Sequence, residues 1–196
     1  MPTYIRNRIA GESYFFTVNL GDQGRGLLDQ RIDVVRAAYV EMARLRPVQC
    51  DAMVILPDHI HAVWTLPDGD DDHAVRWAHF KSIIANRLFP EASFKAVGGG
   101  RRGPGVWRRR YWAFRIPNPE EFARHVEYCW HDPVAHGLVA RVADWPYSTF
   151  HRDVRNGVVG SDWRGRLQAG RFGERSDHGE SPTMGELFEG VESRKP

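Results

Sequence analysis

Two histidines one residue apart, His59 and His61, are the first candidates for chemistry in this sequence. Side chains at positions i and i+2 of a strand point to the same face, so both imidazoles would project together. Ile60 would then point to the opposite face, toward the core. Two imidazoles a few ångströms apart can share one metal ion. An isolated pair of this kind is more often two ordinary sheet histidines, so the interpretation needs support from other residues.

Tyr128 is the second candidate, because of the helix face on which it would lie. At about 100° per residue, one polar stripe carries Glu121, His125, Tyr128 and Asp132. The opposite, apolar face carries Phe122, Val126, Cys129 and Trp130. A tyrosine used for packing would prefer the apolar face, whereas a nucleophile needs its hydroxyl clear of the core. We therefore interpret Tyr128 as a candidate nucleophile, and His125 as a surface or supporting residue.

Asp132 lies one helical turn after Tyr128 and could complete a metal site with His59 and His61. Two imidazoles and a carboxylate leave positions open for a phosphate oxygen and water. Asp132 also precedes Pro133, and an Asp-Pro pair commonly caps a new helical turn. The two roles have equal weight from the residues alone, and they are compatible.

The elements that must position these residues follow from periodicity and from start and stop signals. The first half of the chain predicts a strand at 14–19, a helix at 29–45, a hairpin of strands 50–56 and 59–66, and a helix at 71–88. The second half predicts a strand at 106–116 and a helix capped by Asn118 that ends near His131. In the helix at 71–88, the residues expected to face inward are Val75, Ala78, Ile83 and Leu88. This order indicates an α+β domain, a ferredoxin-like antiparallel sheet with helices on one face.

Composition limits the class of protein. The chain has 196 residues, 42% of them hydrophobic, and a net charge of +2. We expect one domain over residues 1–163 and a weakly ordered tail over 164–196. Cys50 and Cys129 have neither metal-ligand nor disulfide-scaffold spacing, and we interpret them as reduced thiols of a cytoplasmic protein. No secretory signal and no membrane span are expected.

One segment is strongly basic. Between Glu91 and Glu120 there is no acidic residue, and the cations are Lys95, Arg101, Arg102, Arg108, Arg109, Arg110 and Arg115. Trp107 and Tyr111 lie among them. Arginine and aromatic side chains together suit single-stranded nucleic acid, through phosphate contacts and base stacking. A solvated basic loop without a ligand is the alternative.

These residues carry a family resemblance. The sequence resembles the REP-associated tyrosine transposases, of the HUH single-tyrosine superfamily. The first matching stretch is MVILPDHIHAVW at 53–64. It contains the HUH motif, in which U stands for a bulky apolar residue, here Ile60. The other matching stretches are VWRRRYW at 106–112, VEYCWHDPVAHGLV at 126–139 and DWPYSTF at 144–150. They occur in the family's order.

The resemblance implies the HUH type of α+β fold and a metal-dependent DNA strand transfer. Tyr128 would form a 5′-phosphotyrosine, and His59, His61 and Asp132 would hold Mg²⁺ or Mn²⁺. The partner would be a single-stranded REP-type hairpin, with the protein a monomer or a homodimer. The family usually has an amide at the position of Asp132, but a carboxylate binds these ions at least as well. Ala113 and Phe114 also depart from the family, which often has polar residues there.

Two alternatives remain open at this point. The first is a hairpin- or sequence-specific DNA-binding protein without cleavage activity, suggested by Asp132 in place of the amide. The second is a metal-dependent hydrolase that activates water with the histidine pair, which leaves the polar position of Tyr128 unexplained.

Overall fold

The computed structural model describes residues 11–21, 26–89 and 105–165, and the tail predicted for 164–196 lies almost wholly outside them. Its first half contains β1 (Ser13–Asn19), α1 (Ile32–Leu45), β2 (Gln49–Ile55), β3 (His59–Thr65) and α2 (His73–Leu88). Its second half contains β4 (Trp112–Arg115), α4 (Pro119–Ala135), the 3₁₀ turn η2 (Val142–Asp144) and α5 (Phe150–Arg155). The four strands form one sheet in the order β2-β3-β1-β4, and each neighbouring pair is antiparallel. The ferredoxin-like α+β prediction is confirmed.

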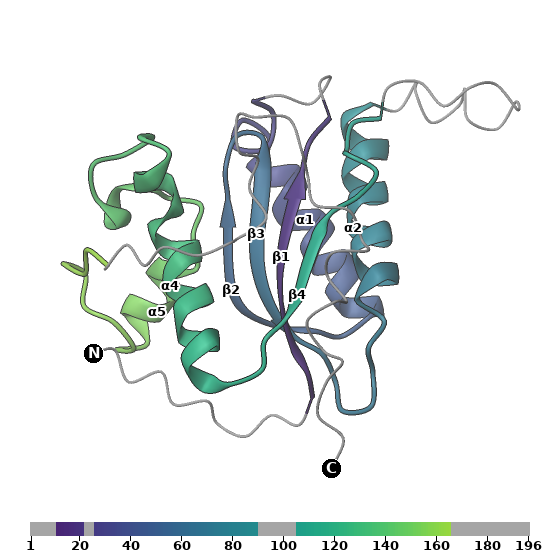
Figure 1. Ribbon diagram of the computed structural model, residues 1–196. Helices are drawn as coiled ribbons and strands as arrows, with labels where there is room; N and C mark the ends of the chain where they lie inside the picture. The colour runs from purple at the N-terminus through teal and green to yellow at the C-terminus, as the bar shows by residue number, and fades with distance from the viewer. Residues whose placement is uncertain (1–10, 22–25, 90–104, 166–196) are drawn as a thin grey trace, which may run out of the picture.

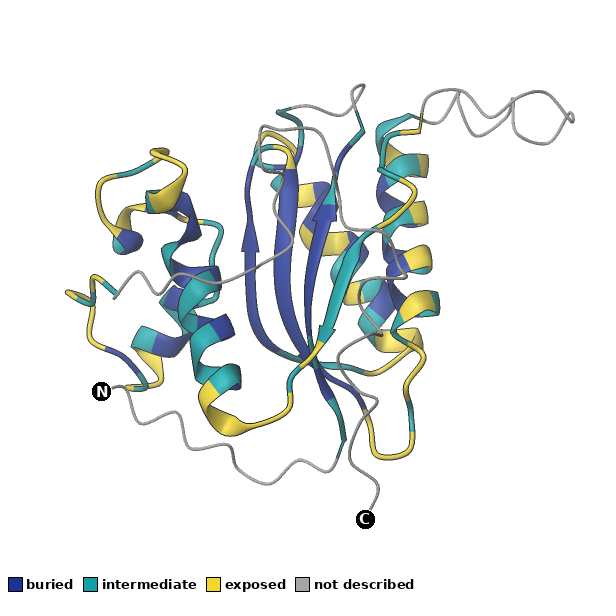
Figure 2. Cartoon of the chain, in the orientation of Figure 1, coloured by how far each residue is buried: buried dark blue, intermediate teal, exposed yellow. Residues whose placement is uncertain are grey.

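Helices cover both faces of this sheet, so the expectation of helices on one face was wrong. Figure 1 shows α1 and α2 on one side of the strands and α4 and α5 on the other. The reason is visible in β1, where the consecutive residues Phe15 and Phe16 are both fully buried. Phe16 belongs to the apolar cluster under α1 and α2, and Phe15 to the cluster under α4. Strand β3 is buried along its whole length (Figure 2).

The β2–β3 hairpin places the histidine pair on the α4 face. Ile55 pairs with Ile60 across the turn, and the Leu56 amide donates to the His59 carbonyl over 2.9 Å. Ile60 belongs to the cluster on the α1 and α2 face, as expected from the alternation of a strand. His59 and His61 therefore face the layer that α4 covers.

Helix α4 begins as predicted and continues further than predicted. The Asn118 side chain accepts a hydrogen bond from the Glu121 amide over 2.8 Å, and Pro119 occupies the first turn. The helix passes through Pro133 to Ala135, although a proline disfavours helical geometry at the residue before it, here Asp132. Asp132 and Pro133 are both buried, so the packing of this turn outweighs the local restriction. Gly137, with φ of 67°, then takes the left-handed conformation that ends the helix.

Two further predictions differ from the structure. The strand expected at 106–116 is a short β4, preceded by an isolated bridge between Leu20 and Trp107. In α2, Ala78 is exposed, and the buried apolar residues are Trp77, Phe80, Ile83 and Ile84. The large aromatic residues thus determine which face of α2 packs on the sheet. In the described part of the chain, no helix combines the length and the apolar character that crossing a membrane requires.

Candidate metal and nucleophile site

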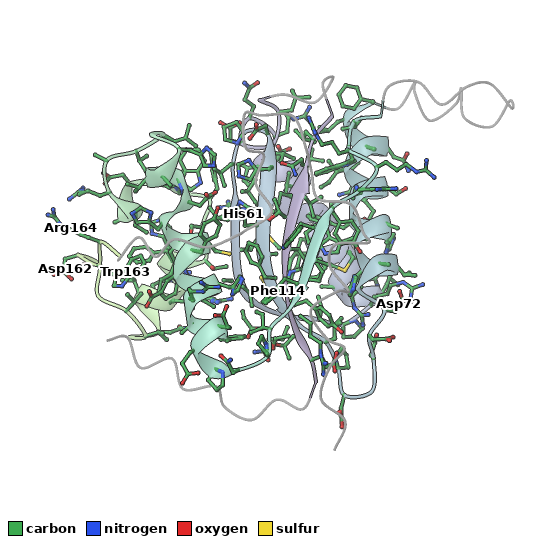
Figure 3. The ribbon with its side chains drawn as sticks, viewed as in Figure 1. His61, Asp72, Phe114, Asp162, Trp163 and Arg164 are labelled. Atoms are coloured by element: carbon green, nitrogen blue, oxygen red, sulfur yellow. The ribbon has the colours of Figure 1, made fainter. Side chains whose placement is uncertain are left out.

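The carboxylate of Asp132 lies at the centre of the candidate site. Its Oδ2 atom is 3.3 Å from Nε2 of His59 and 3.5 Å from Nε2 of His61. The side chains of Asp132 and His61 are fully buried, and that of His59 is 7% exposed. Figure 3 labels His61 in the layer between the sheet and α4. A strand and a helix that are far apart in the chain therefore bring the three predicted ligands together.

Hydrogen bonds at the far side of each imidazole fix its orientation. Nδ1 of His59 lies 2.7 Å from Oδ1 of Asp58, and Nδ1 of His61 lies 2.9 Å from Oγ1 of Thr17, its cross-strand partner. When Nδ1 carries the hydrogen and donates it, the Nε2 lone pair is available. This is the arrangement that protein metal sites use to orient their histidines.

Tyr128 lies beside the histidine pair. Its ring is 5.2 Å from the ring of His61 and 5.8 Å from that of Phe15, edge-on in both cases. The side chain is partly buried, in contrast to Cys129 and Trp130, which are buried on the apolar face. The tyrosine is therefore next to the candidate ligands and still partly open to solvent.

The electrostatics of the site favour a positive charge near Asp132. Burial disfavours the charged form of His59, but hydrogen bonds to Asp132 and Asp58 outweigh it and raise the His59 pKa to about 9. Burial also disfavours the charged form of Asp132, but the nearby His61 and His59 hold its pKa below the usual value. In the metal-free protein, a proton on His59 thus partly neutralises two carboxylates.

Asp132 also offers a second oxygen. Its Oδ1 atom is buried and has no hydrogen-bond partner within the described part of the chain, and Nε2 of His136 is 3.5 Å away. One ligand atom from each of His59, Asp132 and His136 lies within 4.8 Å of the other two. The buried oxygen and this mixed nitrogen and oxygen donor set fit a divalent metal ion.

His125 supports the site through packing. Its ring lies between Phe15 at 4.8 Å and Phe114 at 5.2 Å, and its Nδ1 donates to the Glu121 carbonyl over 2.7 Å. Burial lowers its pKa. It is 1% exposed, which corrects the expectation of a surface residue. Because Phe15 touches both His61 and Tyr128, His125 acts on the site through that ring.

A pocket opens next to the site. It has a volume of about 380 Å³, and its lining includes His59, His136, Asp58, Asn19 and Arg108. Arg108 is the one residue of the basic segment, among those the structure describes, that lines this pocket. The pocket therefore places Arg108 on the same surface as His59 and His136.

The other predicted DNA-binding residues have varied surroundings. Arg109 and Arg110 are exposed, and Arg115 forms an ion pair with Glu12. Trp107 donates from Nε1 to the Lys81 carbonyl over 3.0 Å, and the Tyr111 hydroxyl lies 2.9 Å from Nδ1 of His73. Both rings pack in part against the α1 and α2 cluster, so only part of each face is open to a base. Three predicted residues, Lys95, Arg101 and Arg102, lie outside the described residues.

Sequence reasoning missed Thr17, Asp58 and His136. The spacing of Asp132 and His136 at i and i+4 could have indicated His136, because these positions share a helix face. Asp58 directly precedes His59 in the hairpin. Thr17 had no sequence signal, since only the strand register places it beside His61.

The chain is similar to two curated proteins. It is 39% identical over 175 residues to the REP-associated tyrosine transposase of Escherichia coli (strain K12), covering 89% of this chain and 98% of that protein. It is 39% identical over 166 residues to the putative REP-associated tyrosine transposase of Haemophilus influenzae (strain ATCC 51907 / DSM 11121 / KW20 / Rd), covering 84% of this chain and 94% of that protein. A solved structure, that of the REP-associated tyrosine transposase bound to a REP hairpin, matches with a TM-score of 0.73 and 39% identity. The match covers 90% of this chain and 99% of that one. No family model matches the chain.

Proposed function

This chain belongs to the REP-associated tyrosine transposases, and from that premise we propose that it cleaves and rejoins single-stranded DNA with Tyr128 as nucleophile. The observation that carries the proposal is the position of the Tyr128 ring, 5.2 Å from His61 at the edge of the His59, His61 and Asp132 cluster. A hydrolase that activates water does not need a tyrosine nucleophile at this position.

The proposed reaction is a transesterification. The phenol oxygen of Tyr128 attacks the scissile phosphorus, and the bond from phosphorus to the 3′ oxygen breaks. The phenol loses its proton, and the departing strand takes one up as a free 3′-hydroxyl. The other strand end becomes a 5′-phosphotyrosine, and attack by a 3′-hydroxyl reverses the step. A phenol has an unperturbed pKa of about 10, so it needs a nearby group that favours its charged form.

His59, His61 and Asp132 would hold the divalent ion, Mg²⁺ or Mn²⁺. When bound there, such an ion supplies positive charge for the phosphate oxygens and favours the phenolate. Thr17 and Asp58 hold the two imidazoles with Nε2 toward Asp132. Phe15 and His125 keep the Tyr128 ring beside His61. The protein thereby orients the reacting groups before DNA binds.

The proposed substrate is a REP-type hairpin. One solved relative is bound to such a hairpin, and the chain covers nearly all of that relative. Arg108 in the pocket and the exposed Arg109 and Arg110 offer contacts for the phosphates of a strand entering the site. A hairpin-binding protein without cleavage activity is the second candidate, because Asp132 replaces the family's usual amide.

A denaturing gel with a 3′-labelled REP hairpin oligonucleotide and Mn²⁺ distinguishes the candidates. The strand transferase retains the label on the protein, and Tyr128→Phe abolishes this adduct. Tyr14→Phe is the matched control, since Tyr14 is also partly buried but packs against the α1 and α2 cluster. A hydrolase would release a shortened oligonucleotide without an adduct, and a pure binding protein would leave the oligonucleotide intact.

A further inference from the structure

We infer that His136 is a fourth ligand of the divalent ion, which makes the site one of three imidazoles and one carboxylate. The inference rests on the proposed function in one respect, since it assumes an ion held by His59, His61 and Asp132. It adds a residue from the end of α4 that the strand motif does not contain.

Three histidines surround the carboxylate of Asp132. Oδ2 faces His59 and His61 at 3.3 and 3.5 Å, while Oδ1 faces Nε2 of His136 at 3.5 Å. Ligand atoms about 2.1 Å from one ion lie about 3 Å apart when adjacent and about 4 Å apart when opposite. One atom each from His59, Asp132 and His136 lies within 4.8 Å of the others, so a small inward movement would bring these three onto one ion.

The buried Oδ1 atom is the independent observation. A buried carboxylate oxygen without a hydrogen bond is costly unless a cation or a donor satisfies it. Within the described residues, Oδ1 has no hydrogen-bond partner, and it points toward His136. An ion between Oδ1, His136 and His59 would satisfy it.

The helix end holds His136 in place. The His136 amide donates to the Asp132 carbonyl over 2.9 Å, so the two side chains leave the same face one turn apart. His136 caps the end of α4, and the next residue, Gly137, takes the left-handed conformation. The His136 ring lies 5.1 Å from the His59 ring, and its side chain is 40% exposed in the pocket. It can therefore adjust toward an ion without disturbing the core.

The donor set determines which ions bind well. Mg²⁺ prefers oxygen ligands and keeps several waters, whereas imidazole suits the transition metals. A site with three nitrogen donors should therefore prefer Mn²⁺ over Mg²⁺ more strongly than a site with two. Four protein ligands would still leave two positions on a six-coordinate ion, enough for a phosphate oxygen and one further ligand.

The test measures Mn²⁺ and Mg²⁺ binding to the purified full-length chain by titration calorimetry, with pulsed EPR of the Mn²⁺ form. His136→Ala should weaken Mn²⁺ binding by about tenfold or more, change Mg²⁺ binding by less than about threefold, and remove one set of ¹⁴N couplings. His79→Ala, on α2 across the sheet, is the matched control and should alter neither.

The outcomes separate this inference from the proposed function. If His59→Ala abolishes Mn²⁺ binding while His136→Ala leaves affinity and ¹⁴N couplings unchanged, His136 is not a ligand and the proposed function stands. If the unaltered chain binds no Mn²⁺, or His59→Ala binds it normally, the proposed metal site fails and the inference fails with it. Circular dichroism of each variant verifies that it is folded.

Discussion

Asp132 is one of the positions at which the sequence departs from the expected family pattern, and its surroundings give this departure a physical meaning. A carboxylate between two buried imidazoles adds a full negative charge that a neutral amide would not have. That charge strengthens attraction to a cation, and without an ion it retains a proton on His59, whose pKa is about 9. A carboxylate at position 132 therefore favours binding of a cation or a proton at this site.

Restoring the amide should weaken ion binding. We expect Asp132→Asn to reduce Mn²⁺ affinity by about tenfold, because the carboxylate contributes charge as well as an oxygen ligand. Titration calorimetry measures the change, and Asp144→Asn, a carboxylate in a surface ion pair with Arg141, is the control. Equal affinity in the Asp132 variant and the unaltered chain would show that Asp132 is not a ligand.

The raised pKa of His59 gives a second expectation, for protein kept metal-free with a chelator. A folded-state pKa of about 9, against 6.5 for an unperturbed histidine, adds stability below pH 6.5 that is lost as the pH rises through 9. The free energy of unfolding should fall by about 3 kcal/mol or less over that window. Asp58→Asn should diminish the fall, because Asp58 accepts the Nδ1 hydrogen bond. A flat profile from pH 6.5 to 9 would contradict the assignment.

The sequence indicated the candidate site residues that the structure brings together, but not the residues that orient them. His59, His61 and Tyr128 stand out because their types and spacing are unusual for packing. Thr17 and His125 do not, since a threonine in a strand and a histidine in a helix have many ordinary roles. Their positions near the site follow from strand register and from the neighbouring Phe15 ring, which are properties of the tertiary structure.

At the scale of elements, α4 carries the proposed nucleophile Tyr128 and the proposed ligand Asp132. The start of the helix at Asn118 was predictable, because the cap and Pro119 are local signals. Its continuation through Pro133 was not, because buried contacts of Asp132 and Pro133 override the local preference. The covering of both sheet faces was missed for a similar reason, since alternation alone does not reveal that Phe15 and Phe16 are both buried.

The amino-terminal cap should affect stability without affecting chemistry. We expect Asn118→Ala to lower the free energy of unfolding by about 1 kcal/mol, because the Glu121 amide loses its acceptor. Chemical denaturation measures the change, with Asn156→Ala at the exposed end of α5 as the control. Mn²⁺ affinity of the folded variant should remain unchanged, because the ligands lie more than two turns away. A loss of ion binding at full folding would show that the cap acts on the site.

At the scale of the whole molecule, the fold places Arg108 of the basic segment in the lining of a pocket that also contains His59 and His136. The net charge of +2 predicts little about a polyanion partner, because the relevant charge is local. Arg108 lines the pocket, and Arg109 and Arg110 are exposed beside it in the chain. Trp107 and Tyr111 pack in part against the core. The sequence pattern alone could not distinguish this packing from a role in stacking on bases.

Removing the exposed arginines should weaken hairpin binding mainly through electrostatics. We expect Arg109→Ala combined with Arg110→Ala to weaken binding about equally for different sequences, and to reduce the slope of log K against log salt by about 2. Fluorescence anisotropy across a salt series measures both effects. Arg155→Ala, an exposed cation on α5, should leave the slope unchanged. An unchanged slope in the double variant would place the DNA elsewhere.

Identifying the amino acid that becomes attached to DNA tests the strand-transfer proposal most directly. The folded chain is incubated with a REP hairpin and Mn²⁺, the adduct is digested with protease and nuclease, and the modified peptide is sequenced by mass spectrometry. We expect a nucleotide 5′-phosphate on the phenol of Tyr128. We expect no adduct when a metal chelator is added to the incubation. An adduct on another residue, or cleaved DNA without any adduct, would contradict the proposed role of Tyr128.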